Sequence, residues 1–422
     1  MVYALILFAL TYVLMLLFQP YRPYIALGSA LAFVLSGMLP AAKAAAAIDF
    51  NVLLMITGTM GTVALVIESG LPFLLSDIIV EKVPNVKWAI VALSLFAGAV
   101  SAFMDNVATV LMIAPIALAM AKKLEINPVK MMIAIAVSSN LQGAATLVGD
   151  TTSILLAGYA DMDFNDFFWY RGSPGIFFAV ELGALLSAVI LIFMMRKDKE
   201  PIGAAERTKV TDYVPGALLL LTVAALIVAS MFPNRPDLTN GLICTGIMLV
   251  GVIYHALRRR SFKAMLDPIR EIDFETILLL FGLFIVIGGI TEMGVVDAIA
   301  DLFNRVAGGN IFVIYTLITW ASVAVSAFID NIPYVATMLP VMQGIAADLG
   351  VDPTVLYFGL LSGATLGGNL TPLGASANIT AIGLLRKEGY TVENRDFMRI
   401  GVPFTLAAIT PAYIFLWIFY GF

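Results

Sequence analysis

The chain has 422 residues, of which 61% are hydrophobic and only 13% are charged, with a formal net charge of −5. Soluble domains contain about 45–50% apolar and about 25% charged residues, so this composition excludes a soluble enzyme, a disordered protein and a nucleic-acid binder. One cysteine, Cys244, and one histidine, His255, exclude a disulfide framework and disfavour a thiolate or imidazole metal site. A protein that crosses the membrane several times is the class that remains.

Apolar stretches long enough to span a bilayer, which takes about 20 residues, recur along the whole chain. In order they are 2–18, 24–42, 51–69, 131–160, 174–195, 213–231, 238–257, 274–292, 353–385 and 400–421. The first is expected to be an uncleaved span, because no basic region precedes it and no small-residue cleavage site follows it.

Two further apolar stretches, 87–121 and 311–347, carry an Asp-Asn pair near their middle and are predicted to be re-entrant hairpins. The spans 131–160 and 353–385 are too long for one crossing and are interrupted by Gly, Thr, Asn and Pro, which predicts broken helices. The predicted fold class is therefore an all-α polytopic membrane protein with about ten spans and two hairpins.

The basic residues indicate the orientation. Placing 196–212 in the cytoplasm leaves only Lys43, Arg171, Arg235 and Arg305 outside, which is a strong positive-inside bias. Both termini are then expected on the extracytoplasmic side. The expected location is the cell membrane, with a prokaryotic inner membrane favoured.

An internal repeat organises the chain. Residues 101–106 (SAFMDN) recur 225 positions later as 326–331 (SAFIDN), and the same spacing relates Gly143 to Gly368 and Thr146 to Thr371. The predicted division is N-terminal spans in 1–47, a first repeat in 48–196, linking spans and cytoplasmic loops in 197–271, and a second repeat in 272–422. Each repeat has three crossings and a hairpin, and two spans link them, so the second repeat is expected to be inverted. Inverted repeats with broken helices are typical of secondary transporters, although a duplication kept only for packing is the alternative.

The hairpin tips carry the first candidate residues: Asp105, Asn106, Asp330 and Asn331. A carboxylate at the bilayer centre costs about 2.5–3.5 kcal/mol on insertion scales, so two of them at equivalent places indicate function. The alternative is that each Asp only caps the half-helix that follows it.

The broken helices carry the second group of candidates, whose glycines, hydroxyls and amides can supply close backbone approach and oxygen ligands for a hard cation such as Na⁺. The alternative is a small-residue packing face. The residues predicted to bind substrate or ion are Asn140, Gly143, Thr146, Gly149, Asp150 and Thr151 in the first break, and Gly368, Asn369, Thr371, Gly374, Ser376 and Asn378 in the second. A Na⁺ site is expected near Asn106, Asp150, Asn331 and Asn378.

The two half-sites are not expected to be equivalent, because Asp150 is matched by Ala375 in the second repeat. No Lys or Arg lies in the tips or the breaks, which predicts a centre made of carboxylates alone. Such a centre suits a proton, a cation or a neutral solute, and it suits a di- or tricarboxylate only if cations accompany it. No cofactor is expected, and the coupling ion is H⁺ or Na⁺.

These motifs resemble the ion transporter superfamily. The resemblance covers about residues 48–421 and rests on 101–106, 143–150, 326–333 and 367–378. Within it, the chain is most similar to the branch of arsenite permeases, sodium/proton antiporters and the P protein, and it shares the citrate transporter-like domain. The resemblance implies a homodimer and an elevator-type movement of the hairpins and broken helices. It also implies an ATPase partner subunit if the chain is an arsenite permease.

The function predicted is therefore an ion-coupled secondary transporter, not an enzyme, that works by alternating access. Its substrate is expected to be a cation or neutral oxyacid, such as Na⁺ or arsenite and antimonite. The alternatives are a sodium- or metal-coupled citrate or dicarboxylate transporter, a channel, and an intramembrane aspartyl protease.

Overall fold

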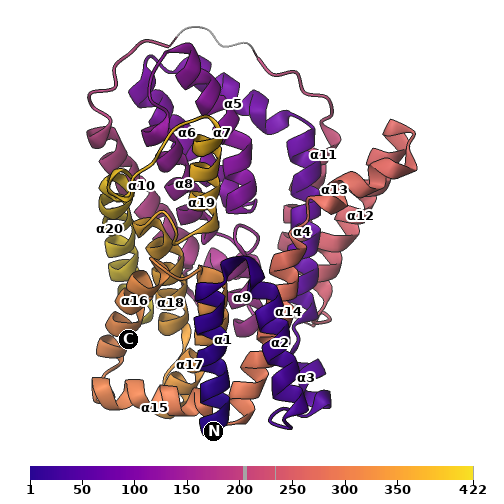
Figure 1. The fold of residues 1–422 in the computed structure, drawn as a ribbon, viewed down its shortest axis with the longest axis vertical. Coiled ribbons are helices and arrows are strands. Elements are labelled where there is room, and N and C mark those ends of the chain that lie inside the picture. The colour runs from indigo at the N-terminus through magenta and orange to yellow at the C-terminus, as the bar shows by residue number, and fades with distance from the viewer. Residues whose placement is uncertain (203–206, 233, 422) are drawn as a thin grey trace.

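The computed structural model describes residues 1–202, 207–232 and 234–421, which form a helical bundle (Figure 1). Its first half contains α1 (Val2–Leu17), α2 (Arg22–Leu35), α3 (Ala41–Ala47), α4 (Phe50–Glu68), α5 (Leu71–Lys82), α6 (Val86–Ser101), α7 (Asn106–Lys123), α8 (Val129–Gly143), α9 (Thr151–Ala160) and α10 (Ile176–Met194). Its second half contains α11 (Val214–Ala229), α12 (Thr239–Arg259), α13 (Leu266–Arg270), α14 (Phe274–Glu292), α15 (Val295–Ala307), α16 (Ile311–Ser326), α17 (Asn331–Leu349), α18 (Thr354–Gly367), α19 (Ser376–Lys387) and α20 (Asn394–Tyr420).

The remaining regular structure of the described chain is short. A two-stranded antiparallel hairpin, β1 (Trp169–Tyr170) with β2 (Ser173–Pro174), lies between α9 and α10. The 3₁₀ turns are η1 (Gln19–Tyr21), η2 (Asn165–Phe167), η3 (Phe262–Met265) and η4 (Gly368–Leu370).

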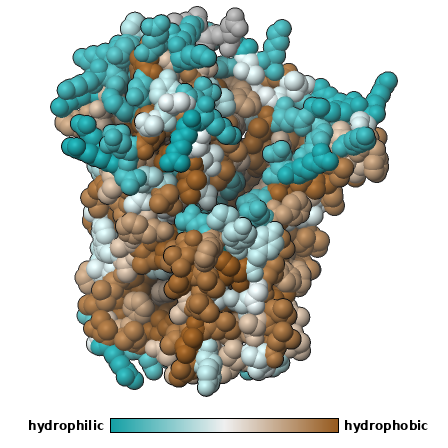
Figure 2. All heavy atoms as spheres, viewed as in Figure 1, coloured by the Kyte–Doolittle hydropathy of each residue, from teal (hydrophilic) through white to brown (hydrophobic). Residues whose placement is uncertain are grey.

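The predicted all-helical membrane fold is confirmed in its coarse form. In the described part of the chain, seven helices are long and apolar enough to cross a membrane, or eight if α15 and α16, which meet at a bend of 115°, form one broken span. Figure 2 shows hydrophilic residues gathered at the upper end and a broad hydrophobic belt below them. The count of ten spans stays a prediction, and the predicted linking region 197–271 includes residues 203–206 and 233, which lie outside the described chain.

In the described chain, four helices lie where neither a span nor a hairpin was expected, namely α3, α5, α13 and α15. On α15, Val295 and Ala300 are buried whereas Asp297 and Asp301 are exposed. This amphipathic pattern is typical of a helix with one face on the protein, and a search for long apolar runs does not detect it. The predicted span 24–42 is also shorter in the structure, because α2 ends at Leu35.

The order of helices in the first half recurs in the second. Each half has an Asp-capped helix (α4, α14), an amphipathic helix (α5, α15), a helical hairpin (α6–α7, α16–α17), a broken helix (α8–α9, α18–α19) and a last long helix (α10, α20). In Figure 1, α5, α6 and α7 lie in the upper part of the molecule, whereas α15, α16 and α17 lie in its lower part.

Two glycines at matching positions allow matching helix contacts. A Cβ atom at Gly58 of α4 would lie 2.3 Å from the backbone carbon of Cys244 on α12, and one at Gly282 of α14 would lie 2.7 Å from that of Ala26 on α2. Only glycine permits such close backbone approach. Helix α12 therefore packs on α4 as α2 packs on α14.

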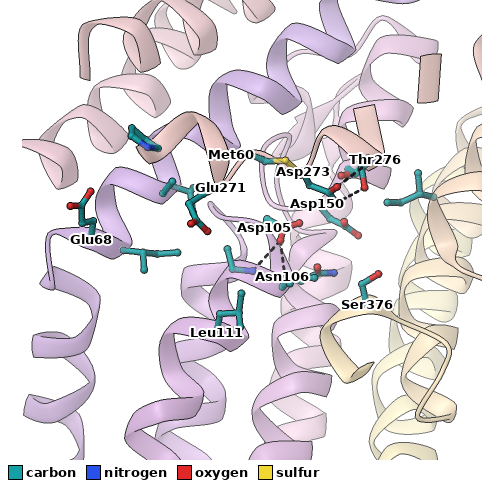
Figure 3. A pocket seen from close by; sticks show the side chains of 18 of the residues that line it. Met60, Glu68, Asp105, Asn106, Leu111, Asp150, Glu271, Asp273, Thr276 and Ser376 are labelled. Carbon is teal, nitrogen blue, oxygen red and sulfur yellow. Dashed lines mark hydrogen bonds between the residues drawn. The ribbon is translucent and has the colours of Figure 1, made fainter. Parts of the chain in front are cut away.

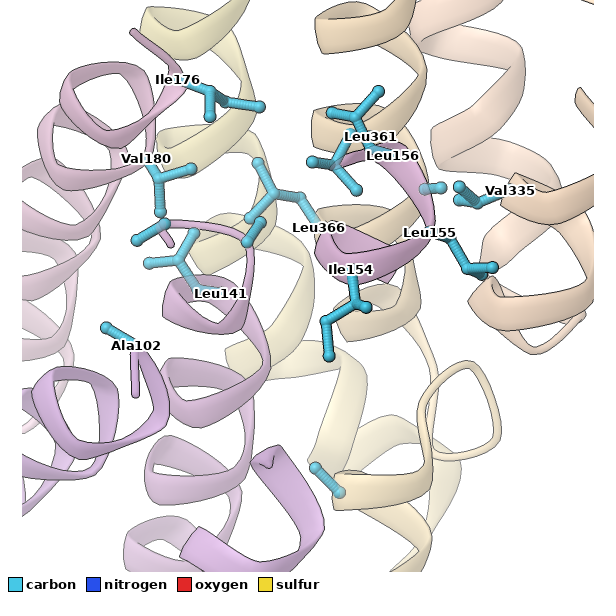
Figure 4. Packing of buried hydrophobic residues seen from close by; sticks show 14 of the residues in the cluster. Ala102, Leu141, Ile154, Leu155, Leu156, Ile176, Val180, Val335, Leu361 and Leu366 are labelled. Carbon is cyan, nitrogen blue, oxygen red and sulfur yellow. The ribbon is translucent and has the colours of Figure 1, made fainter. Parts of the chain in front are cut away.

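The interior of the bundle surrounds the broken helices. The buried apolar side chains of α9, among them Ile154, Leu155 and Leu156, pack with Leu361 of α18 and Val335 of α17 (Figure 4). Since α9 belongs to the first half and α17 and α18 to the second, this packing holds the two halves together where the helices are interrupted.

Candidate functional site

The first hairpin tip is a helix start capped by its own aspartate. The Asp105 carboxylate accepts hydrogen bonds through Oδ1 from the backbone N–H groups of Val107 (2.9 Å) and Ala108 (3.1 Å). Capping satisfies N–H groups that the first turn of a helix leaves unpaired. The capping role that the sequence allowed is therefore present, and Asp105 is also partly exposed to a cavity, described below.

The first break folds against this tip through backbone carbonyls. The Thr146 hydroxyl donates to the Ala102 carbonyl. A Cβ atom at Gly149 would lie 2.5 Å from the Gly143 carbonyl oxygen and 2.8 Å from those of Ser101 and Ala102. Three carbonyl oxygens from two segments thus converge on a space that only glycine leaves open. Carbonyl oxygens are a ligand type that hard cations prefer.

The second tip and break repeat this arrangement. The Asp330 Oδ1 atom accepts from the N–H of Ile332 (3.2 Å), and the Thr371 hydroxyl donates to the Ala327 carbonyl. A Cβ atom at Gly374 would lie 2.6 Å from the Gly368 carbonyl oxygen. The Asn378 amide donates to that same carbonyl (3.0 Å). These contacts match those of the first tip and break at a spacing of 225 residues.

Buried amides join the two halves. The fully buried Asn140 amide donates to the Thr365 carbonyl (2.7 Å) and to Asn369 Oδ1 (3.1 Å), while its own Oδ1 accepts from Asn106 (3.0 Å). Asn369 in turn donates to the Val137 carbonyl (2.9 Å). These bonds connect the first tip to both breaks, so the site has one hydrogen-bonded centre.

The Asp150 carboxylate lies where the halves meet. Its Oδ2 atom accepts from the hydroxyl of Thr152 (2.9 Å) and, at 3.5 Å, from the Asn331 amide of the second tip. Asp150 is only 4% exposed. Because an unpaired carboxylate is costly to bury, a group with two neutral donors and little contact with solvent favours binding a proton or a cation.

A cavity of about 490 Å³ opens onto these groups (Figure 3). Helices α4, α7, α13 and α14 and the N-terminal ends of α9, α17 and α19 surround it. The predicted residues that line it are Asp105, Asn106, Asp150, Thr151, Asn331 and Ser376. The other predicted residues do not line this cavity and form the framework around it: Asn140, Gly143, Thr146, Gly149, Asp330, Gly368, Asn369, Thr371, Gly374 and Asn378.

The lining also contains four acidic residues that were not among the predicted site residues: Glu68, Asp267, Glu271 and Asp273. Asp273 caps α14 by accepting from the N–H of Thr276 (3.1 Å). Its motif Ile272-Asp273-Phe274 matches Ile48-Asp49-Phe50 at a spacing of 224, a signal that could have indicated it. Asp267 and Glu271 carry no such signal, because only the packing of α13 beside α4 brings them to the cavity.

The expected centre of carboxylates alone is wrong for Asp330. The Arg22 guanidinium at the start of α2 donates to Asp330 Oδ2 at 3.1 Å. Arg22 belongs to neither a tip nor a break, so an inventory of those segments could not find it. Asp105 and Asp150 have no ion-pair partner among the described residues.

Comparison with known proteins identifies relatives over most of the chain. A transporter of Mycobacterium bovis with no assigned substrate is 32% identical over 382 residues, covering 88% of this chain and 87% of that protein. A 46 kDa membrane protein of Mycobacterium leprae is 34% identical over 329 residues, covering 76% and 74%. The human P protein is 24% identical, covering 87% of this chain and 53% of that protein.

Among solved structures, the YdaH transporter of Alcanivorax borkumensis has a similar fold, with a TM-score of 0.59 at 13% identity, covering 92% of this chain and 88% of that one. Residues 12–363 match the citrate transporter family. The family match and the match to the P protein together confirm the resemblance to the superfamily that contains the P protein. The chain belongs to the citrate transporter family, and the similar proteins of Mycobacterium bovis and Alcanivorax borkumensis are named as transporters.

Proposed function

We propose that the protein is an ion-coupled secondary transporter, with its binding site in the cavity between the two hairpin tips. One observation carries this proposal. Asp105, Asp150, Asp267, Glu271 and Asp273 line a single cavity together with Glu68, whose carboxylate pairs with Arg259, and among the residues described there no Lys or Arg lines it. Walls of one charge sign concentrate ions of the opposite sign. The site therefore favours H⁺ or Na⁺ as the coupling ion.

Alternating access is supported by a second cavity, of about 700 Å³. Its lining repeats that of the first at a spacing of 224. The residues that correspond to Met60, Val63, Ala64, Ile67 and Glu68 are Phe284, Ile287, Gly288, Thr291 and Glu292, and Asp49 corresponds to Asp273. The first cavity lies beside the C-terminal part of α4 and the second beside its N-terminal end. Two equivalent cavities at opposite ends of one helix are what an inverted pair of access routes requires.

We further propose that the inverted repeat comprises ten helices in each half, α1–α10 and α11–α20. This extends the predicted repeats to the N-terminal and linking spans, because α2 packs on α14 as α12 packs on α4. Five crossings in each half would invert the second. The basic residues then favour a cytoplasmic segment 196–212 and extracytoplasmic termini.

For substrate we propose a small cation exchanged for protons, or a neutral oxyacid such as arsenite. The name of the family supports citrate as a second candidate. A citrate trianion would meet carboxylates in this cavity, so it would have to enter with Na⁺ or as a metal complex. In that case the acidic lining would hold the cations and the cations would hold the citrate.

The test is transport by the purified protein in liposomes, with an imposed pH or Na⁺ gradient and Na⁺, Li⁺, arsenite, antimonite, citrate and succinate as solutes. We expect gradient-driven accumulation of a cation or arsenite that Asp150→Asn abolishes. Asp297→Asn, on the exposed face of α15, is the matched control and should transport normally. Uptake of citrate only with Na⁺ or a divalent metal would favour the second candidate. Uptake that only equilibrates the solute, whatever pH or Na⁺ gradient is imposed, would contradict a coupled transporter.

A further inference from the structure

The Arg22 side chain places a positive charge in the second half-site. Its Nη1 donates to Asp330 Oδ2 at 3.1 Å, and its Nε donates to the Met15 carbonyl at 3.3 Å. The side chains of Arg22 and Asp330 are only 17% and 14% exposed. The Ser376 hydroxyl donates to the same Asp330 oxygen at 3.4 Å. Since a guanidinium stays charged at any physiological pH, this carboxylate has a permanent counter-ion.

Among the residues that the structure describes, none gives the first half-site such a counter-ion. Asp105 occupies the position equivalent to Asp330, and its carboxylate accepts from the two backbone N–H groups of the α7 start. Ala26 and Cys244, which contact the matching glycines Gly282 and Gly58, are 218 positions apart, and the same spacing leads from Arg22 to Asn240. The residue at the sequence position that matches Arg22 is therefore a neutral amide and not a cation.

Helix α1, which precedes the helix that carries Arg22, is held against the second tip by a further contact. The Tyr12 hydroxyl of α1 donates to the Pro333 carbonyl at 2.6 Å and contacts the Thr337 hydroxyl, both on α17. Arg22 and Tyr12 thus approach the start of α17 together. Contacts of α1 with α17 and of the Arg22 Nε atom with the Met15 carbonyl hold the guanidinium beside the carboxylate.

We propose that Arg22 is a built-in counter-ion that occupies the Asp330 carboxylate, so that the protein takes up cations only at the half-site of Asp105 and Asp150. The inference rests on the proposed function and makes Arg22 a residue that determines how many cations bind. A cation approaching Asp330 would have to displace a fixed charge of the same sign. The same cation meets no such charge at Asp150.

The test measures binding of radioactive Na⁺ to the purified full-length protein. Arg22→Gln should add one Na⁺ per chain, because it frees Asp330, whereas Arg22→Lys keeps the charge and should not add one. Asp330→Asn leaves Arg22 without its partner and should weaken Na⁺ binding about tenfold, corresponding to about 1.4 kcal/mol. The double variant Arg22→Gln/Asp330→Asn should recover that affinity, because it removes both charges.

Arg207→Gln is the matched control, since Arg207 pairs with Glu81 at 2.8 Å on an exposed surface away from the cavity. An arginine with only a structural role predicts no additional Na⁺ in Arg22→Gln and no recovery in the double variant, and either result overturns the inference. If Arg22→Gln does not fold, the comparison of Asp330→Asn with the double variant still decides it. A wild-type protein that binds no Na⁺ contradicts a Na⁺-coupled function as well, whereas normal wild-type binding with unchanged variants contradicts only the role of Arg22.

Discussion

Replacing Gly149 by alanine tests whether the convergent carbonyls form the working geometry of the first half-site. The added Cβ atom would lie 2.5 Å from the Gly143 carbonyl oxygen and 2.8 Å from those of Ser101 and Ala102. Favourable contacts between heavy atoms lie near 3.5–4.0 Å, and none of these three oxygens belongs to a side chain that could rotate away. The tip and the break must therefore separate.

Overpacking of this kind costs about 1–3 kcal/mol. If about 2 kcal/mol of that cost falls on the ion-bound conformation, cation affinity should decrease about 30-fold, because 1.4 kcal/mol corresponds to a factor of ten. The assay is transport at several cation concentrations together with the thermal midpoint in detergent. Gly246→Ala on α12, where a Cβ atom meets nothing within 4 Å, is the control. Transport and stability of Gly149→Ala equal to those of the control would refute the reasoning.

Three further variants test the framework of the site. Gly374→Ala places a Cβ atom 2.6 Å from the Gly368 carbonyl oxygen, so its thermal midpoint should decrease about as much as that of Gly149→Ala; an unchanged midpoint would contradict the equivalence of the two breaks. Asn140→Ala removes three hydrogen bonds, and at about 1 kcal/mol each the free energy of unfolding should fall by about 3 kcal/mol, measured by denaturant titration in detergent. Tyr12→Phe removes the bond to the Pro333 carbonyl and should cost about 1 kcal/mol in the same titration, whereas Tyr3→Phe, on a side chain that is 82% exposed, should cost nothing measurable.

The local geometry of the site can be predicted from the sequence because it depends on short spacings along the chain. Asp105 and Gly149 lie in motifs that recur at one spacing, and each motif folds against its own neighbour in the same half. Contacts between distant segments leave no such pattern. Arg22 reaches a carboxylate 308 positions away, and Glu271 joins the cavity only through packing of the linking region.

The differences between the halves explain how a duplicated architecture can hold a single charged site. Two fully equivalent half-sites would each place uncompensated carboxylates in the bundle, and each would cost free energy without a cation. Ala375 replaces Asp150 in the second half, and Arg22 neutralises the remaining Asp330 there. The second tip still contributes a neutral donor, since the Asn331 amide reaches Asp150 at 3.5 Å. The first half therefore supplies the charge, and the second supplies a neutral hydrogen-bond donor to it.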